Sequence, residues 1–241
     1  MKGVVLAGGT GTRLYPLTRV TNKHLLPIYN RPMIYYPIKT LVDSGITDIT
    51  IVLGGESVGD FVKLLGDGEE LGCRLNYVYQ KKAGGIAEAL YLAKPIVEGH
   101  KIAVILGDNI FEDKFDYQVE EFEQFDWGSF LFLKEVEDPE RFGVAEIKDC
   151  MIERIVEKPI APISNLAVTG LYFYDEAIFD AIEKVIETKG YSARGELEIT
   201  DVNNYYVENS LVVFDKIDGF WSDAGTFDTL LKSSNFIKKI Q

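Results

Sequence analysis

Short apolar runs alternate with helix-patterned segments through the first half of the chain, and this alternation limits the folds available to it. Four runs read as buried strands: Gly3–Ala7, Ile49–Leu53, Leu75–Tyr79 and Ile102–Leu106. Three segments between them have helical spacing: Pro32–Ser44, Val58–Leu65 and Gly85–Val97. Strand and helix in alternation predict βαβ units, and therefore a parallel sheet with helices on both faces.

The pattern changes after about Ser129, where strands follow one another with short polar links. The expected strands are Ser129–Val136, Val144–Ile147, Arg154–Val156, Val168–Tyr174 and Leu211–Ile217. Helical spacing returns in Ala177–Ile186, Glu196–Glu208 and Phe227–Ile240. We therefore predict one α/β domain: a Rossmann-like, mostly parallel central sheet flanked by helices, with an embedded antiparallel subdomain.

Composition excludes several classes of protein. The 241 residues carry a formal net charge of −13, which disfavours a nucleic-acid or anionic-membrane surface as partner. Cys73 and Cys150 are too few and too far apart for a disulfide framework or a zinc site. The apolar run at the N-terminus is too short for a signal peptide, and no segment is long enough to cross a bilayer. We expect a cytoplasmic protein.

The basic residues are distributed unevenly. Asp43 is the first acidic residue, and six Lys or Arg residues precede it. The same stretch contains the glycine-rich run Gly8-Gly9-Thr10-Gly11-Thr12-Arg13-Leu14. Backbone N–H groups can approach phosphate oxygens closely where no Cβ intervenes, so the run predicts a phosphate-binding loop.

Two common glycine-loop motifs do not fit this run. The dinucleotide fingerprint requires a third glycine where Leu14 stands, and the Walker motif requires a closing Gly-Lys-Ser/Thr. Arg13 lies in the loop instead, and Lys23 follows it. A guanidinium donates two parallel hydrogen bonds to phosphate oxygens, which favours a triphosphate clamp. The alternative is that Arg13 is only a solvated loop residue.

Several blocks of sequence resemble the sugar-1-phosphate nucleotidylyltransferases. The resemblance begins at Leu6–Thr18, Asn22–Pro27 and Arg31–Pro37. It continues in Gly107-Asp108-Asn109, Phe142-Gly143-Val144, Glu157-Lys158-Pro159, Thr169–Tyr172, Arg194–Asp201 and Trp221–Thr226. All of these blocks stand in the family's order and cover almost the whole chain. The thymidylyltransferase branch is the most similar.

The resemblance implies a nucleotide-diphospho-sugar transferase fold and a specific reaction. A nucleotidyl group passes from dTTP to α-D-glucose 1-phosphate, giving dTDP-glucose and pyrophosphate for dTDP-rhamnose or related deoxysugars. Residues 1–128 would bind the nucleotide and 129–226 the sugar phosphate, with a C-terminal helix at 227–241. A homo-oligomer, either dimer or tetramer, is expected. UTP in place of dTTP, or a non-catalytic nucleotide-sugar-binding subunit, are the alternatives.

The family's functional residues carry over position by position. Catalysis is expected of Arg13, Lys23, Asp108 and Lys158. The nucleotide would contact Leu6, Gly8, Gly9, Thr10, Gly11, Thr12, Arg13, Gln80, Gly85 and Asp108. The sugar phosphate would contact Asn109, Gly143, Glu157, Lys158, Thr169, Tyr172 and Arg194. Mg²⁺ would bind Asp108 and Asp223, because it prefers hard carboxylate oxygens.

Four further acidic residues receive structural interpretations. Glu196 and Glu198 are expected at the start of a helix, where carboxylates interact favourably with the helix dipole. Asp113 and Asp116 are expected on the solvated surface.

The chain departs from the family pattern at two places, both next to residues that are expected to bind the nucleotide. Lys81-Lys82-Ala83-Gly84 replaces the more familiar Pro-Ser-Pro-Asp, and His24 stands where Gln usually follows the catalytic Lys. Pyrimidine binding is still expected, but the choice between thymine and uracil stays open.

Overall fold

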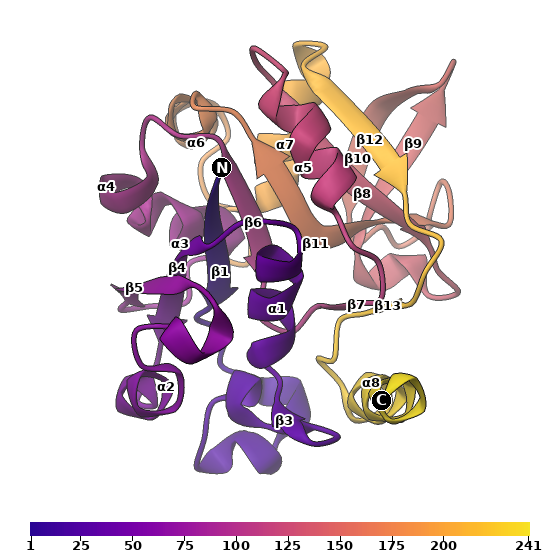
Figure 1. Cartoon of the computed structure of the whole chain (residues 1–241). Coiled ribbons are helices and arrows are strands. Elements are labelled where there is room, and N and C mark those ends of the chain that lie inside the picture. The colour runs from indigo at the N-terminus through magenta and orange to yellow at the C-terminus, as the bar shows by residue number, and fades with distance from the viewer.

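A nine-stranded sheet forms the centre of the computed structural model, which describes residues 1–241 (Figure 1). The main strand order is β10-β9-β11-β6-β1-β4-β5, and β8 and β12 extend the sheet from β11. The strands are β1 Lys2–Ala7, β4 Asp48–Gly54, β5 Arg74–Gln80, β6 Ile102–Leu106, β8 Ser129–Glu135, β9 Gly143–Lys148, β10 Met151–Glu157, β11 Leu166–Tyr174 and β12 Val212–Lys216.

The two halves of the chain contribute different pairings to this one sheet. Strand β1 lies between β4 and β6 and is parallel to both, and β4 is parallel to β5. Strand β11 runs antiparallel to β6, β8 and β9. The predicted α/β fold is confirmed, and the antiparallel strands continue the central sheet instead of forming a second one.

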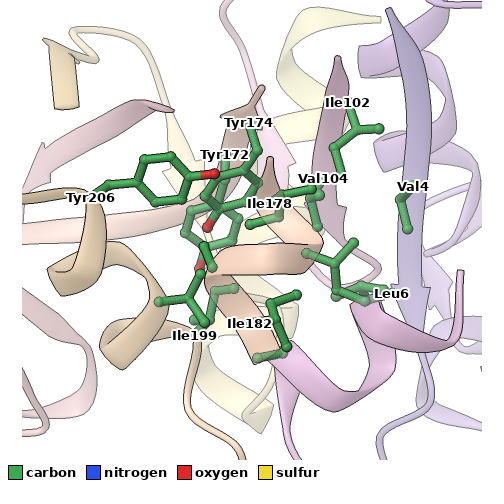
Figure 2. Close-up of a cluster of buried hydrophobic side chains, with 14 of the residues drawn as sticks. Val4, Leu6, Ile102, Val104, Tyr172, Tyr174, Ile178, Ile182, Ile199 and Tyr206 are labelled. Atoms are coloured by element: carbon green, nitrogen blue, oxygen red, sulfur yellow. The ribbon is translucent and has the colours of Figure 1, made fainter. Parts of the chain in front are cut away.

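Helices cover both faces of the sheet. Helices α1 (Tyr35–Asp43), α2 (Val58–Leu65) and α5 (Asp116–Glu123) pack on one face. The other face carries α3 (Ile86–Leu92), α4 (Lys94–Val97), α6 (Ile178–Thr188) and α7 (Ile199–Glu208). Figure 2 shows part of this second layer, where Tyr172, Tyr174 and Tyr206 pack together. None of the helices combines the length and apolar character needed to span a bilayer.

Two helix predictions require correction. The segment Gly85–Val97 forms two helices instead of one, and the break falls at Ala93. Pro95 explains it, because proline lacks an N–H and its ring clashes with the carbonyl four residues earlier. Helix α5 was not predicted at all, because its apolar stripe is narrow and most of its residues are charged or polar.

The acidic residues near α5 differ in their surroundings. Asp116 lies exposed in the first turn of the helix, as predicted. Asp113 is half-buried, and its Oδ2 has no hydrogen-bond partner. Burial raises the pKa of Asp113, and neighbouring Glu112 raises it further. The prediction of a solvated Asp113 is therefore wrong.

Several short turns and strands lie outside the main sheet, and two of these strands contact the C-terminal helix. The loop after β1 contains the 3₁₀ turns η1 (Thr12–Leu14), η2 (Leu17–Arg19) and η3 (Lys23–Leu25), then strands β2 (Pro27–Ile28) and β3 (Arg31–Pro32). Two further turns are η4 (Glu69–Leu71) and η5 (Pro139–Arg141). Strands β7 (Ile110–Phe111) and β13 (Trp221–Ser222) pair below the main sheet, next to α8 (Phe227–Ile240) (Figure 1).

Helix α8 is fixed at its start and along its inner face. Thr226 caps the helix by accepting from the backbone N–H of Thr229, and the Thr229 hydroxyl donates back to its carbonyl. Phe236 stacks on Phe220 with ring centroids 4.0 Å apart. The Tyr29 N–H donates to the Ser234 hydroxyl at 3.2 Å. The helix therefore contacts both the segment after β1 and the segment that leads into β13.

Replacing Phe173 by Ala should destabilise the protein by about 3–5 kcal/mol. Phe173 is 1% exposed, and its ring meets Phe132 edge-on at 5.0 Å, so the truncation leaves a cavity. Guanidinium unfolding at equilibrium measures the change. Tyr117→Ala is the control, since this ring is 70% exposed and its loss should cost less than about 0.5 kcal/mol. A loss below about 1 kcal/mol for Phe173→Ala would contradict the described packing.

Candidate active site

A cavity of about 620 Å³ opens at the carboxyl ends of β1, β5 and β6 and extends to β10 and α7. This is the edge at which open α/β sheets bind ligands, and the volume suits a nucleotide-sized molecule. The predicted residues that line it are Leu6, Gly8, Gly9, Thr12, Arg13, Lys23, Gln80, Gly85, Asp108, Asn109, Gly143, Glu157, Lys158, Tyr172, Arg194 and Asp223. One cavity therefore collects residues from both halves of the chain.

Three predicted residues do not line the cavity. Thr10 is an exposed residue of the glycine loop, and Gly11 turns the loop with φ of +65°. Thr169 is fully buried, and its hydroxyl has no partner. Its neighbours Val168 and Gly170 line the cavity in its place, in a stretch where β11 bulges out of register with β8.

The glycine loop packs directly against two functional side chains. A Cβ added at Gly8 would overlap the amide of Gln80, and one added at Gly11 would lie 2.9 Å from the Cβ of Lys23. Side chains at either position would displace Gln80 or Lys23. The glycines therefore serve close packing around the cavity as well as backbone exposure.

Lys23 forms an ion pair with Asp108 at the centre of the cavity. Lys23 begins the turn η3, whose start Asn22 caps by accepting from the His24 N–H at 3.0 Å. Asp108 is 7% exposed, and burial by itself would raise its pKa. Lys23 outweighs burial, with help from His24 and a hydrogen bond from Asn109, and the pKa falls from 3.8 to about 2.

Asn109 fixes the orientation of Asp108. Its Nδ2 donates to Asp108 Oδ1 at 3.0 Å. Its Oδ1 accepts from the Gly170 N–H at 3.0 Å and from Trp221 Nε1 at 2.7 Å. The side chain is 1% exposed and holds three segments of the chain together.

The small β7–β13 ribbon brings Asp223 to the same place. Ile110 pairs with Ser222 and Phe111 with Trp221, so Asp108 lies just before one strand and Asp223 just after the other. The pairing continues beyond the ribbon, where the Phe220 carbonyl accepts from the Glu112 N–H at 2.9 Å. Two carboxylates from distant parts of the sequence thus face one cavity.

Asp223 is half-buried, between cationic and anionic neighbours. Burial raises its pKa and so does the negative charge of Asp108, while Arg141 and Arg13 act in the opposite direction. Arg141 Nη2 donates to Asp223 Oδ2 at 2.7 Å. Arg13 is exposed and reaches the same segment, since a Cβ on Gly225 would lie 2.9 Å from Arg13 Nη2.

The two carboxylates fit a divalent cation bound together with phosphate. No group of three His, Cys, Asp or Glu residues converges anywhere in the chain, so the protein supplies two carboxylates and no closed cage. Mg²⁺ is commonly held by one or two carboxylates, with phosphate oxygens and water completing its shell. The mutual repulsion of Asp108 and Asp223 is the electrostatic feature that such a cation relieves.

A network of charges lines the opposite end of the cavity. The Thr200 hydroxyl donates to Glu157 Oε2 at 2.6 Å, and Lys158 Nζ lies 3.0 Å from Glu157 Oε1. Arg194 Nη2 lies 2.8 Å from Glu198 and 3.4 Å from Glu196. Two cations thus lie at this end, each beside carboxylates that hold its position.

The interpretation of Glu196 and Glu198 as helix-start residues is confirmed in position for Glu198 and is wrong for Glu196. Glu198 is the residue before α7, but its carboxylate makes no capping hydrogen bond and accepts from Arg194 instead. Glu196 lies outside the helix and also contacts Arg194. Both line the cavity.

Gln80 and Gly85 form one wall of the cavity. Gln80 is 5% exposed, and its Nε2 has no partner within the chain. A buried amide N–H without an acceptor is costly unless a ligand supplies one. Gly85 has φ of +104°, and a Cβ there would lie 2.6 Å from the backbone nitrogen of Leu197.

Sequence reasoning missed several lining residues. They include Arg141, Phe142, Thr200, Asn203 and Trp221. Arg141 directly precedes the Phe142-Gly143 block, and Trp221 opens the block that contains Asp223, so both stood next to recognised motifs. Their long-range partners left no signal in the sequence.

Comparison with known proteins gives one consistent result. A sequence profile described as "Nucleotidyl transferase" matches residues 2–240. A glucose-1-phosphate thymidylyltransferase of Neisseria meningitidis is 42% identical over 245 residues, covering 100% of this chain and 84% of the relative. The enzyme of the same name from Mycobacterium tuberculosis is 40% identical, with 100% and 83% covered.

Solved structures agree with these sequence relatives. A Bacillus anthracis protein assigned as a glucose-1-phosphate thymidylyltransferase, crystallised with a sucrose, superimposes with a TM-score of 0.93 at 48% identity. The match covers 100% of this chain and 96% of that one. A UDP-glucose pyrophosphorylase has a TM-score of 0.84 at 24% identity, with 100% and 99% covered, and shows a shared fold.

Lowering the pH from 6.5 to 4.5 should destabilise the wild type more than the His24→Gln variant. The difference between the two losses in the free energy of unfolding should be about 2–3 kcal/mol. His24 is buried and its pKa falls from 6.5 to about 3, chiefly through burial and then through Lys23. Below pH 6.5 the unfolded chain therefore takes up a proton that the folded chain does not.

Urea unfolding at several pH values measures this difference in slope. His100→Gln is the matched control, because His100 is an exposed loop residue whose ring hydrogen-bonds only with the Glu98 carbonyl. Equal slopes for the wild type and His24→Gln would show that His24 is not held neutral.

Proposed function

The chain belongs to the nucleotidyl transferase family, and we propose that it transfers the thymidylyl group of dTTP to α-D-glucose 1-phosphate. The products are dTDP-glucose and pyrophosphate. The names of the relatives that match the full chain support this reaction. A nucleoside triphosphate and a sugar 1-phosphate are the substrates in this proposal.

The central observation is a single cavity in which two carboxylates, one buried and one half-buried, face three basic side chains. Asp108 and Asp223 lie together with Lys23, Arg13 and Arg141. A triphosphate and a sugar phosphate bring several negative charges, and such a set of charges can hold both. The glycine loop lies at one end of the cavity, and Lys158 with Arg194 lies at the other.

The proposed step is an in-line displacement at the α-phosphorus of dTTP. An oxygen of glucose 1-phosphate forms the new P–O bond, and pyrophosphate leaves with the electrons of the broken one. A phosphate monoester with a second pKa of about 6 is mostly dianionic at neutral pH, so the attacking oxygen needs no general base. His24 agrees with this, since it lies in the cavity with its pKa lowered to about 3.

Each basic residue at the nucleotide end receives a separate role. Arg13 holds the leaving phosphates through paired N–H donors, because its guanidinium is exposed at the mouth of the cavity. Lys23 stabilises negative charge on the α-phosphate from its position beside Asp108. Asp108 and Asp223 would hold Mg²⁺, which when bound supplies Lewis-acid stabilisation of charge on the phosphates.

The base and the sugar phosphate would occupy opposite ends. Gln80 Nε2 lacks a partner in the chain, so it is available to donate to a carbonyl oxygen of a pyrimidine. Lys158 and Arg194 would bind the sugar phosphate, and Glu157 would accept from sugar hydroxyls. Residues 1–128 then mainly serve the nucleotide and 129–226 the sugar phosphate. The homo-oligomer stays a prediction.

Two alternatives are less well supported. A uridylyltransferase would share the cavity, but the relatives at 40–42% identity are thymidylyltransferases. A non-catalytic binding subunit would not need Arg13, Lys23 and Asp108 together in one cavity.

With glucose 1-phosphate as acceptor, we expect kcat/KM for dTTP to exceed that for UTP by at least about tenfold. The physical reason is the apolar side of the base wall, where Ile86 and Ala89 line the cavity and can contact the thymine methyl group. Pyrophosphate release measures both reactions. Equal or higher kcat/KM with UTP would favour the uridylyltransferase, and no turnover with either would exclude the proposed reaction.

Arg13→Ala should lower kcat/KM by about a hundredfold or more while the melting temperature stays unchanged. The guanidinium is exposed and forms no ion pair in the free protein, although its charge acts on Asp223, so its removal should affect bound phosphates far more than the fold. Arg19→Ala, in the neighbouring exposed turn η2, is the control and should leave both quantities unchanged. A wild-type kcat/KM for Arg13→Ala would show that Arg13 is only a solvated loop residue.

A further inference from the structure

Arg141 is the basic residue near the two central carboxylates to which the proposed reaction assigns no individual role. It lies in η5 and spans two carboxylates: Nη1 lies 2.6 Å from Asp138 Oδ2, and Nη2 lies 2.7 Å from Asp223 Oδ2. Its guanidinium lies over the Phe142 ring at 5.0 Å from the centroid. That ring in turn contacts Trp221, with centroids 5.2 Å apart.

This geometry leaves part of the guanidinium free to bind something else. An arginine has five N–H donors, and only two hydrogen bonds hold Arg141 here. The side chain is 24% exposed and lines the cavity. The pair with Asp138 anchors one side of the guanidinium, while the other side faces the cavity.

Arg141 also stands at the boundary between the two ends of the cavity. The next residue, Phe142, accepts from the Lys158 N–H at 2.9 Å, and Gly143 pairs with Glu157. On its other side, Arg141 touches Asp223. A cation at this boundary is adjacent to the place where the two phosphates would meet.

The two candidate metal ligands share one feature that points to exchange. Each is paired with a basic side chain, Asp108 with Lys23 and Asp223 with Arg141. Ligation of a divalent cation by Asp223 competes with the Arg141 pair for the same carboxylate. If a divalent cation takes one of these carboxylates, the basic side chain paired with it becomes free to donate to a phosphate oxygen.

We propose that Arg141 is an exchangeable cation, which neutralises Asp223 in the free protein and turns to a phosphate oxygen at the reaction centre when a divalent cation takes that carboxylate. This inference rests on the proposed function for the identity of the phosphates. Its first half, competition between Arg141 and the metal, concerns the free protein alone. Arg141 thus links metal binding to phosphate binding.

The test compares wild type, Arg141→Gln and Arg141→Lys by calorimetric titration with Mn²⁺ alone, without nucleotide. Arg141→Gln should bind Mn²⁺ about tenfold more tightly, because the competing guanidinium is gone. Arg141→Lys keeps the competing charge and should bind it within about twofold of the wild type. Unchanged or weaker Mn²⁺ binding by Arg141→Gln would overturn the proposal, since a merely structural arginine would give that result.

Kinetics with dTTP and glucose 1-phosphate supply the second measurement. Arg141→Gln should lower kcat by about a hundredfold despite its tighter metal site, and Arg141→Lys should recover part of that loss. A kcat equal to the wild-type value in Arg141→Gln would overturn the role at the phosphates. Arg154→Gln is the matched control, since Arg154 forms an exposed pair with Glu146 at 2.7 Å on β10 and should change neither measurement.

The two proposals fail separately. If the wild type turns over neither dTTP nor UTP, the proposed reaction fails, while the Mn²⁺ titration still decides the competition. If Arg141→Gln does not fold, Arg141→Lys carries the kinetic test. Its kcat should then fall by at least about tenfold with Mn²⁺ affinity retained, and an unchanged kcat would overturn the proposal.

Discussion

The pairing of β7 with β13 is the contact on which the site depends. It joins the end of the parallel half-sheet to the segment before α8, and so places Asp108 and Asp223 in one cavity. Asn109 strengthens the junction by accepting from Trp221 and donating to Asp108. Two like charges brought together in a buried place repel each other, so this junction also creates the need for compensating cations.

The cavity meets that need by pairing its charges. Lys23 and Arg141 each hold one of the two central carboxylates, and Arg194 joins the glutamates at the far end. Paired buried charges avoid the large cost of isolated ones, and they can exchange partners when a charged ligand enters. Under the proposed function, the same pairs that stabilise the cavity would also supply donors to phosphate. Glycines around Lys23 and Gln80 allow the close packing that this arrangement requires.

Much of the fold follows from local pattern, and each exception has an identifiable physical cause. Strands such as β1 and β6 are buried on both faces, so they appear in the sequence as continuous apolar runs. Helix α5 has too narrow an apolar stripe to be found in this way. Thr169 was assigned to the pocket by its block, but a bulge in β11 leaves it buried outside the lining. Arg141 was missed because its partner Asp223 lies far away in the chain.

The sequence by itself determined the strands of the main sheet, most of the helices, the glycine loop and the family, because these depend on short-range spacing and on ordered blocks of residues. It did not predict the short strands β2, β3, β7 and β13. Only the tertiary structure decided which charges meet. The pairs of Lys23 with Asp108 and of Arg141 with Asp223 each join segments that lie far apart in the chain. Lys23 and Asp108 follow the parallel neighbours β1 and β6, while the pairing of β7 with β13 and the turn η5 bring Asp223 and Arg141 to the same cavity, and no local pattern encodes these partners.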